Sequence, residues 1–395
     1  MPQREGRSPE EPRVIVPLPD MIPSSSELVT EGSAKVPDAS ERTEEVLYYW
    51  DYLHLDDILS SQRPKSDERG NPVHDELFFI TVHQTYELWF KQILAELDSL
   101  VSLMGPKHVA ERDLGVVLSR LQRINSIQRL LVAQLDVLET MSPLDFLDFR
   151  SLLLPASGFQ SVQFRLIENK FGLLERDRLS VEGHSYSDTL RADHVELVIE
   201  SESSPSLFDY VERWLSRTPF VRSSDFDFVA EYQAVVRAKH DATRASLSGN
   251  ADQLQAFEAG IRKFDAIFDR GIWEAEVLQG SRRLSYDAFM AALFINLYRD
   301  EPILQNPYRI LTALIDIDAS LTLWRQRHAV MAHRMLGRLT GTAGSGYDYL
   351  DETARRYTPF RDLFDVSTYL LPRPSLPTLP SSLVSGLDFM NQGAR

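Results

Sequence analysis

The sequence predicts an all-α protein built from long packed helices. Apolar residues recur at steps of three and four from Leu114 to Leu138, as on one face of a long core helix. A second long helix is predicted from His74 to the breaker pair Gly105-Pro106. Alternation with period two is scarce, and residues 195–200 form the best strand candidate. We therefore expect helices to pack on helices around one core.

Other helices follow from local signals. The stretch Ser142-Pro143-Leu144-Asp145 combines an N-cap serine, a proline in the first turn and an acid near the positive helix end, so a short helix should begin there. Apolar periodicity predicts further helices over residues 206–217, 224–247, 252–279, 285–299 and 307–336.

Both ends of the chain differ from this helical body. Residues 1–44 mix prolines with Ser, Glu and Arg, a composition that buries too little apolar surface to offset its ordering entropy. The chain after Pro372 is similar. We therefore expect a flexible tail over residues 1–44, a helical domain over 45–372 and a flexible tail over 373–395.

Composition and charge exclude several classes of protein and site. A formal net charge of −16 makes the general surface a poor partner for nucleic acid or an anionic membrane. The absence of cysteine excludes disulfides, iron–sulfur clusters, thiolate haem ligation and cysteine nucleophiles. The sequence shows no signal-peptide pattern and no run of about 18 apolar residues, so we expect a cytoplasmic protein with no membrane partner.

The first candidate site lies in residues 74–92, HDELFFITVHQTYELWFKQ. On a helix, Phe79, Tyr86 and Phe90 share a face with His83, which places an imidazole within an aromatic stripe. Such a histidine can line a cofactor pocket, and it can equally be an ordinary core or helix-boundary histidine.

A non-haem metal site is an alternative for the same stretch. His74 and His83, with the carboxylates of Asp75, Glu76 and Glu87, could supply two histidines and one carboxylate. His74 and His83 lie on opposite faces of an ideal helix, so both can face one metal only if the helix begins after His74.

His328 is a second candidate. It shares a face with Leu321, Trp324, Met331 and Met335. A neutral imidazole on an apolar face is typical of an axial haem ligand, because the macrocycle needs apolar walls and the iron needs one nitrogen donor. A buried structural histidine shows the same pattern, so both interpretations stay open.

Two further features suit a small polar ligand. Arg150 shares a face with Phe146, so its guanidinium group would lie beside an aromatic wall. A guanidinium can bind a carboxylate through two parallel hydrogen bonds. An internal salt bridge is the alternative. The glycine-rich stretch 341–346 offers backbone N–H groups and two hydroxyls, but it lacks the lysine of a phosphate-binding loop and can also be an ordinary turn.

Several long segments together resemble the tryptophan 2,3-dioxygenase family. They follow the family's order over nearly all of residues 45–372, and they read YYWDYLHLDDILSSQ, HDELFFITVHQTYELWFKQIL, MSPLDFLDFRSLLLPASGFQSVQFRLIENK, RRLSYDAF, LIDIDASLTLWRQRHAVMAHRMLG and DLFDVSTYLLPR. The resemblance implies a helical homotetramer, a dimer of dimers, of the tryptophan/indoleamine dioxygenase type with one haem b per chain. It also implies that O2 opens the C2–C3 bond of L-tryptophan to give N-formylkynurenine, the first step of the kynurenine pathway.

The resemblance implies roles for residues around the cofactor. His328 matches the axial iron ligand, and Trp324 matches a residue packed near it. His83 matches the distal histidine that faces the indole N–H, while Phe79 and Phe146 match the walls that contact the indole.

Other matched residues concern the amino-acid end of the substrate. Arg150 matches the clamp on the carboxylate, and Thr342 matches a hydroxyl near the ammonium and carboxylate groups. Tyr49 and Tyr52 match tyrosines that family members lend to the pocket of a neighbouring subunit.

One loop departs from the family pattern. The family usually reads Gly-Thr-Gly-Gly-Ser-Ser-Gly-Tyr, whereas here Ala343 follows Thr342 and the loop is one residue shorter. Because this loop closes over the substrate's amino-acid end, two alternatives stay open. One is an enzyme of the same fold that acts on a modified tryptophan or inserts a single oxygen atom to give an oxindole, and the other is a haem-binding protein without turnover.

Overall fold

The chain falls into two compact units, Met1–Leu59 and Ser60–Arg395. The computed structural model describes residues 47–106, 108–174, 178, 190–219, 221–223, 225–337 and 347–387. In the first unit it describes two short helices, α1 (Tyr49–Tyr52) and α2 (Leu55–Leu59), neither of which has a buried residue.

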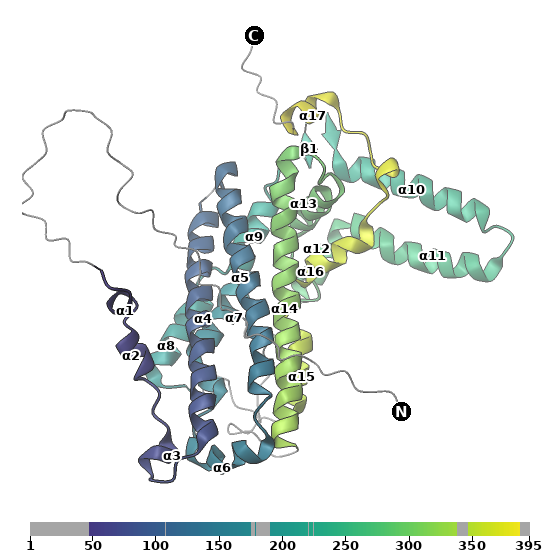
Figure 1. Cartoon of the computed structure of the whole chain (residues 1–395). Helices are drawn as coiled ribbons and strands as arrows, with labels where there is room; N and C mark the ends of the chain where they lie inside the picture. Colours follow the sequence, from purple (N-terminus) through teal and green to yellow (C-terminus); the bar gives the residue numbers. More distant parts are fainter. Residues whose placement is uncertain are drawn as a thin grey trace, which may run out of the picture. The chain divides into compact units, whose positions relative to one another are not determined.

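The second unit is almost wholly helical (Figure 1). Its α-helices are α3 (Lys65–Glu68), α4 (His74–Met104), α5 (Glu111–Leu138), α6 (Pro143–Leu153), α7 (Val162–Phe171), α8 (Ala192–Ser203), α9 (Leu207–Leu215), α10 (Phe228–Ser246), α11 (Ala251–Asp265), α12 (Arg270–Leu278), α13 (Tyr286–Leu297), α14 (Gln305–Leu336), α15 (Tyr347–Arg356), α16 (Arg361–Asp365) and α17 (Ser381–Leu387). Short 3-10 helices are η1 (Gly158–Gln160), η4 (Ala266–Phe268), η5 (Pro302–Leu304), η6 (Val366–Tyr369) and η7 (Arg373–Ser375). Among the described residues the one sheet pairs β1 (Arg222–Ser223) with antiparallel β2 (Phe226–Asp227).

Three long helices, α4, α5 and α14, lie side by side and carry the core (Figure 1). Along α5 the apolar stripe predicted from Leu114 is buried as far as Leu135. The short helix α13 is buried over nearly its whole length, because the sequence YDAFMAALFINL is apolar on every face. The all-α prediction is confirmed.

Two local predictions fare differently. The helix α4 begins at His74 and ends before Gly105, as the sequence predicts. The best strand candidate, residues 195–200, is not a strand: these residues belong to the helix α8, in which Val198 is the one buried residue. A helix satisfies its backbone groups within the segment, whereas a strand there would need a partner strand.

The ordered chain continues past the expected boundary at residue 372. Leu383 on α17 is buried in the core, and the Tyr298 hydroxyl donates to the carbonyl of Pro377 at 2.8 Å. Arg373 forms an ion pair with Asp300. Leucines spaced among the prolines let this segment pack against the body despite its composition.

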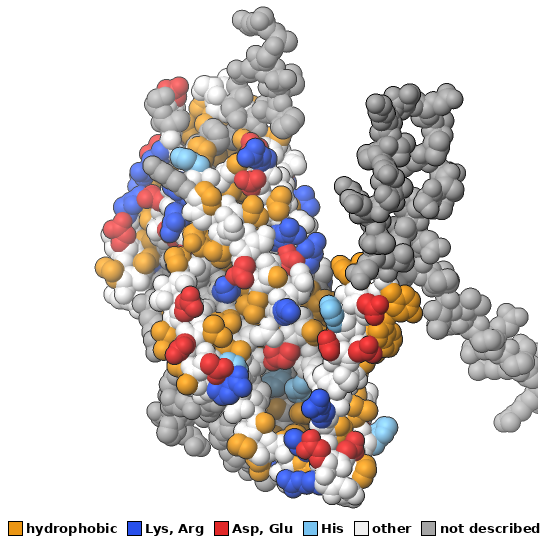
Figure 2. Space-filling view, turned by 90° about the vertical axis from the view of Figure 1, so that its left-hand side faces the viewer, with side chains coloured by type: hydrophobic (Ala, Val, Ile, Leu, Met, Phe, Trp, Pro, Cys, Tyr) orange, Lys and Arg blue, Asp and Glu red, His pale blue; other side chains and the backbone are white. Residues whose placement is uncertain are grey.

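Charged side chains of both signs are interspersed with hydrophobic ones over the face in Figure 2. Within the ranges that the structure describes, no helix is both long and apolar enough to cross a membrane.

Candidate active site

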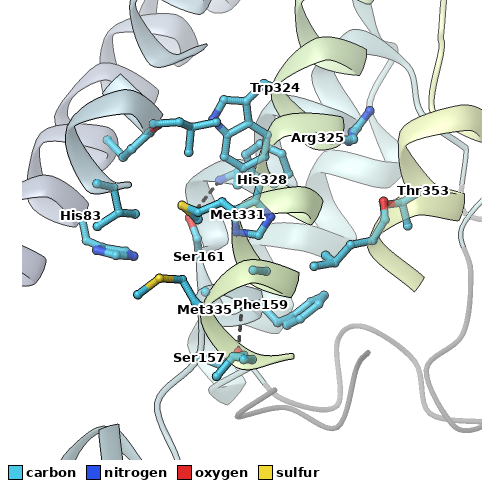
Figure 3. A pocket seen from close by; sticks show the side chains of 18 of the residues that line it. His83, Ser157, Phe159, Ser161, Trp324, Arg325, His328, Met331, Met335 and Thr353 are labelled. Carbon is cyan, nitrogen blue, oxygen red and sulfur yellow. Dashed lines mark hydrogen bonds between the residues drawn. The ribbon is translucent and has the colours of Figure 1, made fainter. Parts of the chain in front are cut away.

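A cavity of about 340 Å³ lies where α4, α5, α6, η1, α7, α14 and α15 converge. Three pairs of predicted residues, which come from distant parts of the sequence, all line it: Phe79 and His83, Phe146 and Arg150, and Trp324 and His328. Figure 3 shows the His83 side chain projecting from α4 toward the side chains of α14. The tertiary structure therefore brings these six predicted residues into one place.

His83 is held by its own helix. Its Nδ1 lies 2.7 Å from the carbonyl oxygen of Phe79, and since a carbonyl only accepts, Nδ1 carries the hydrogen. The Nε2 atom is then an acceptor. Burial lowers the pKa of His83 below its ordinary value, although the Phe79 carbonyl and the Glu87 carboxylate act in the opposite direction. The imidazole is therefore neutral near pH 7 and presents a lone pair.

His328 is positioned differently. Burial, with a smaller contribution from nearby His83, lowers the pKa of His328 to about 4. Its ring is parallel to that of Trp324, one turn earlier on α14, with 5.2 Å between centroids and 7° between planes. None of the residues that the structure describes forms a hydrogen bond with it. His328 is thus a neutral nitrogen donor in an apolar part of the cavity.

Aromatic rings form the wall beside His83. The ring of Phe79 is tilted against the His83 imidazole, with 4.0 Å between the ring centroids. Its centroid lies 5.8 Å from that of the Phe146 ring and 5.5 Å from that of the Phe149 ring. Phe149 is fully buried and supports the other two rings from behind. Arg150 follows Phe149 on α6 and lines the same cavity. The sequence prediction that pairs a forked cation with an aromatic wall therefore agrees with this geometry.

A buried ionic cluster forms another part of the cavity wall. Glu168 on α7 is 2% exposed and contacts Arg325 at 2.7 Å, Arg178 at 2.8 Å and Arg165 at 3.0 Å. Burial alone would raise the pKa of Glu168, but the three guanidinium groups lower it to about 2. Arg325 also donates to the carbonyl of Tyr357 at 2.9 Å. The cluster ties α7 to α14 and places the guanidinium groups of Arg165 and Arg325 in the cavity wall.

The sequence analysis missed this cluster. Arg165 and Glu168 are three residues apart on α7, a spacing that predicts a helical ion pair. Nothing in the local sequence indicates that Arg325, on a helix far along the chain, binds the same carboxylate. Between Trp324 and His328 the sequence reads Arg325-Gln326-Arg327, so no local signal distinguishes Arg325 from an exposed polar residue.

The structure disfavours the non-haem alternative. Both oxygens of Glu76 accept backbone N–H groups, from Lys65 and Ser66 at 2.8 Å each, so this carboxylate anchors α3. Glu87 accepts from the side chain of Gln163 at 2.8 Å. The described ranges contain no group of three or more His, Asp or Glu side chains placed to hold a metal ion.

The positions of three predicted residues relative to this cavity are not described. Tyr49 and Tyr52 lie on α1, in the first unit, with 70% and 64% of their surface exposed. Thr342 lies outside the described residues.

Comparisons with known proteins agree with the segments that carry the resemblance. A family model described as tryptophan 2,3-dioxygenase matches residues 34–370. The tryptophan 2,3-dioxygenase of Bdellovibrio bacteriovorus is 46% identical over 352 residues, which cover 87% of this chain and 98% of that protein. Tryptophan 2,3-dioxygenase B of Danio rerio is 45% identical over 342 residues, which cover 84% of each chain. The tryptophan 2,3-dioxygenase of Dictyostelium discoideum is 42% identical over 353 residues, which cover 87% of this chain and 88% of that protein. The chain belongs to the tryptophan 2,3-dioxygenase family.

Proposed function

We propose that this chain is a haem-dependent dioxygenase that opens the C2–C3 bond of L-tryptophan with O2 and gives N-formylkynurenine. The observation that carries the proposal is the pairing of two neutral histidines in one cavity, one with a fixed acceptor nitrogen and one without a hydrogen-bond partner among the described residues. Haem b, when bound, supplies the iron at which O2 is activated.

The residues on the α14 side fit a haem. His328 is neutral because burial lowers its pKa to about 4, so its nitrogen needs no deprotonation before it binds a metal. Apolar side chains, among them Phe164, Met331 and Met335, line the cavity around it. Arg165 and Arg325 also line this cavity, and guanidinium groups suit the acidic side groups of haem b. We therefore assign His328 as the residue that holds the cofactor.

His83 orients the indole. Because its Nδ1 hydrogen is engaged by the Phe79 carbonyl, its Nε2 is free to accept the indole N–H of the substrate. A neutral imidazole with a lowered pKa serves better as this acceptor than as an obligatory base. The rings of Phe79 and Phe146 hold the flat indole and exclude water, so that positioning contributes much of the rate gain.

Arg150 binds the substrate's carboxylate. Its place beside Phe146 puts a guanidinium at the edge of the aromatic wall, where the amino-acid part of a bound indole amino acid would lie. Thr342, Tyr49 and Tyr52 join the substrate site in this proposal, with the tyrosines supplied by a neighbouring subunit of a homotetramer. The support for these three residues and for the tetramer is the resemblance to the family.

Mass spectrometry of the product formed under labelled O2 tests the proposed reaction. Two labelled atoms in N-formylkynurenine are expected from L-tryptophan. One labelled atom in an oxindole would instead support the alternative enzyme to which the shortened loop after Thr342 points. A protein that binds haem but leaves tryptophan and its derivatives unchanged in the presence of O2 and a reductant would contradict both.

The substrate contacts are tested by replacing Arg150 with methionine. The change should lower kcat/KM for L-tryptophan by about 10-fold to 150-fold, since a charge-assisted hydrogen bond contributes roughly 1.5–3 kcal/mol. Tryptamine, which lacks the carboxylate, is the matched control substrate and should react equally poorly with both proteins. An equal loss for the two substrates would contradict the role of Arg150.

A further inference from the structure

Among the described residues, an aromatic ring and not a hydrogen bond meets the His328 imidazole. A metal-binding histidine almost always donates its second ring N–H to a carboxylate, carbonyl or water, and this bond fixes the orientation of the ring. No hydrogen bond from a described residue reaches His328. The contact that defines its plane is the parallel ring of Trp324, at 5.2 Å and 7°.

Trp324 is itself held from two sides. The Phe164 ring lies 5.2 Å from the Trp324 ring, and the Tyr86 ring lies 6.2 Å away in an edge-on arrangement at 63°. The Trp324 indole N–H is buried, and no described residue meets the full hydrogen-bond geometry with it. A buried donor without a partner costs about 1–3 kcal/mol, so the position of the nearest acceptor decides where this indole rests.

Tyr86 provides that acceptor. It lies on α4, is 6% exposed, and donates its hydroxyl hydrogen to the carbonyl of Leu131 at 2.7 Å. With its hydrogen committed to α5, the Tyr86 oxygen presents only lone pairs to α14. Burial raises the pKa of Tyr86 to about 12, and the nearby indole N–H of Trp324 has a smaller effect in the opposite direction. The hydroxyl is therefore neutral at working pH, and its interaction with the Trp324 indole indicates that the two groups lie close together.

We propose that Tyr86 is a positioning residue for the cofactor, which holds the Trp324 indole flat against the His328 imidazole and so sets the plane in which that imidazole meets the iron. The inference rests on the proposed function, because it requires His328 to be the iron ligand. In this role Tyr86 needs no contact of its own with the iron or the substrate. It acts through Trp324, and the same α4 helix thereby shapes both sides of the site through His83 and Tyr86.

The test uses Tyr86→Phe in the haem-loaded full-length protein. This change removes one oxygen and keeps the ring that packs on Trp324. We expect stoichiometric haem, a shifted or broadened iron–histidine stretching band in the Raman spectrum of the ferrous form, and a several-fold lower kcat with an unchanged KM for L-tryptophan. A purely structural role would lower the melting temperature without moving the band.

Tyr298→Phe is the matched control. The Tyr298 hydroxyl is also buried and also donates to a backbone carbonyl, that of Pro377 at 2.8 Å, but it does not line the cavity. Both variants lose a comparable hydrogen bond and should be destabilised to a similar extent. Only Tyr86→Phe should alter the iron–histidine band. Identical bands in the wild type and in both variants would overturn the inference.

The variant Trp324→Phe provides a second, independent test of the inference. It leaves Tyr86 intact but removes the indole N–H, so its band should shift in the same direction as that of Tyr86→Phe. Adding Tyr86→Phe to Trp324→Phe should cause no further shift, because the two residues act in series. If Tyr86→Phe does not fold, an unchanged band in Trp324→Phe overturns the inference. If the wild type itself binds no haem through His328, it is the proposed function that fails.

Discussion

The two histidines of the cavity differ in what holds them. His83 donates from Nδ1 to the Phe79 carbonyl of its own helix, so its tautomer and its acceptor nitrogen follow from the local backbone. His328 is oriented by the parallel Trp324 ring and has no hydrogen-bond partner among the described residues. A fixed acceptor is suited to an indole N–H, whereas an unengaged neutral nitrogen is suited to a metal. Two residues of the same type thus serve two chemistries because their surroundings differ.

The largest expected effect separates the two residues outright. His328→Ala should lose stoichiometric haem, because the single nitrogen ligand is removed. His83→Ala should keep its haem, because His83 is not a ligand. Absorption spectra and haem content of the two purified variants check this. Retention of haem with an unchanged spectrum in His328→Ala would show that the two roles are assigned wrongly.

The next effect concerns the buried ionic cluster around Glu168, which ties α7 to α14, the helix that carries His328. Glu168→Gln leaves Arg165, Arg178 and Arg325 without their shared carboxylate in a buried place, so the free energy of unfolding should fall by about 3–5 kcal/mol. Urea denaturation of the haem-free protein measures the loss. The control is Glu258→Gln, whose ion pair with Arg244 is at the surface, so this change should lower the free energy of unfolding far less.

The lowered pKa of His328 predicts how stability depends on pH. Between its ordinary pKa of 6.5 and its folded pKa of about 4, the unfolded chain binds a proton that the folded chain does not. The free energy of unfolding of the haem-free protein should therefore fall as the pH drops through this range, by up to roughly 3 kcal/mol.

Replacing His328 with phenylalanine isolates this contribution. Urea denaturation of both haem-free proteins at pH 7.5 and pH 5 should show a smaller loss for the variant. If the free energy of unfolding falls equally in both proteins, the His328 imidazole is not buried in its neutral form. The proposed difference between the surroundings of His328 and His83 would then lose its support.

The smallest effect concerns the acceptor nitrogen of His83. His83→Ala should lower kcat/KM for L-tryptophan about five-fold, since a neutral hydrogen bond contributes roughly 1 kcal/mol. A tryptophan methylated at the indole nitrogen has no N–H to donate, so its kcat/KM should not fall in the same variant. A loss of equal size for both substrates would argue for a role other than accepting the indole N–H.

Local sequence signals anticipated most of the helices. The bounds of α4 follow from His74 and from the breaker Gly105-Pro106, and the stripe from Leu114 to Leu135 is buried as predicted. These predictions succeed because the helical period is a property of neighbouring residues. The strand prediction over 195–200 failed because a short apolar run that alternates with glutamates fits either structure, and the absence of a partner strand is not visible locally.

In the candidate site, too, local features were predicted from the sequence and contacts between distant helices were not. The aromatic stripe around His83, the apolar face of His328 and the neighbourhood of Arg150 and Phe146 are legible in the sequence. The segments that resemble the tryptophan 2,3-dioxygenase family then supply roles for these residues. Neither source predicts that Arg325 shares Glu168 with α7, or that Tyr86 faces Trp324, because both contacts join helices that are distant along the chain.

By itself, then, the sequence determined the helices, their apolar faces and which residues could bind a cofactor or substrate, since each depends on spacings of a few residues. Only the tertiary structure decided the surroundings of those residues. It placed His83 and His328 in one cavity, left the second without a hydrogen bond from the described chain, and set Trp324 parallel to it. Charge state and ring orientation depend on burial and on atoms from distant segments, which come together only when the helices pack.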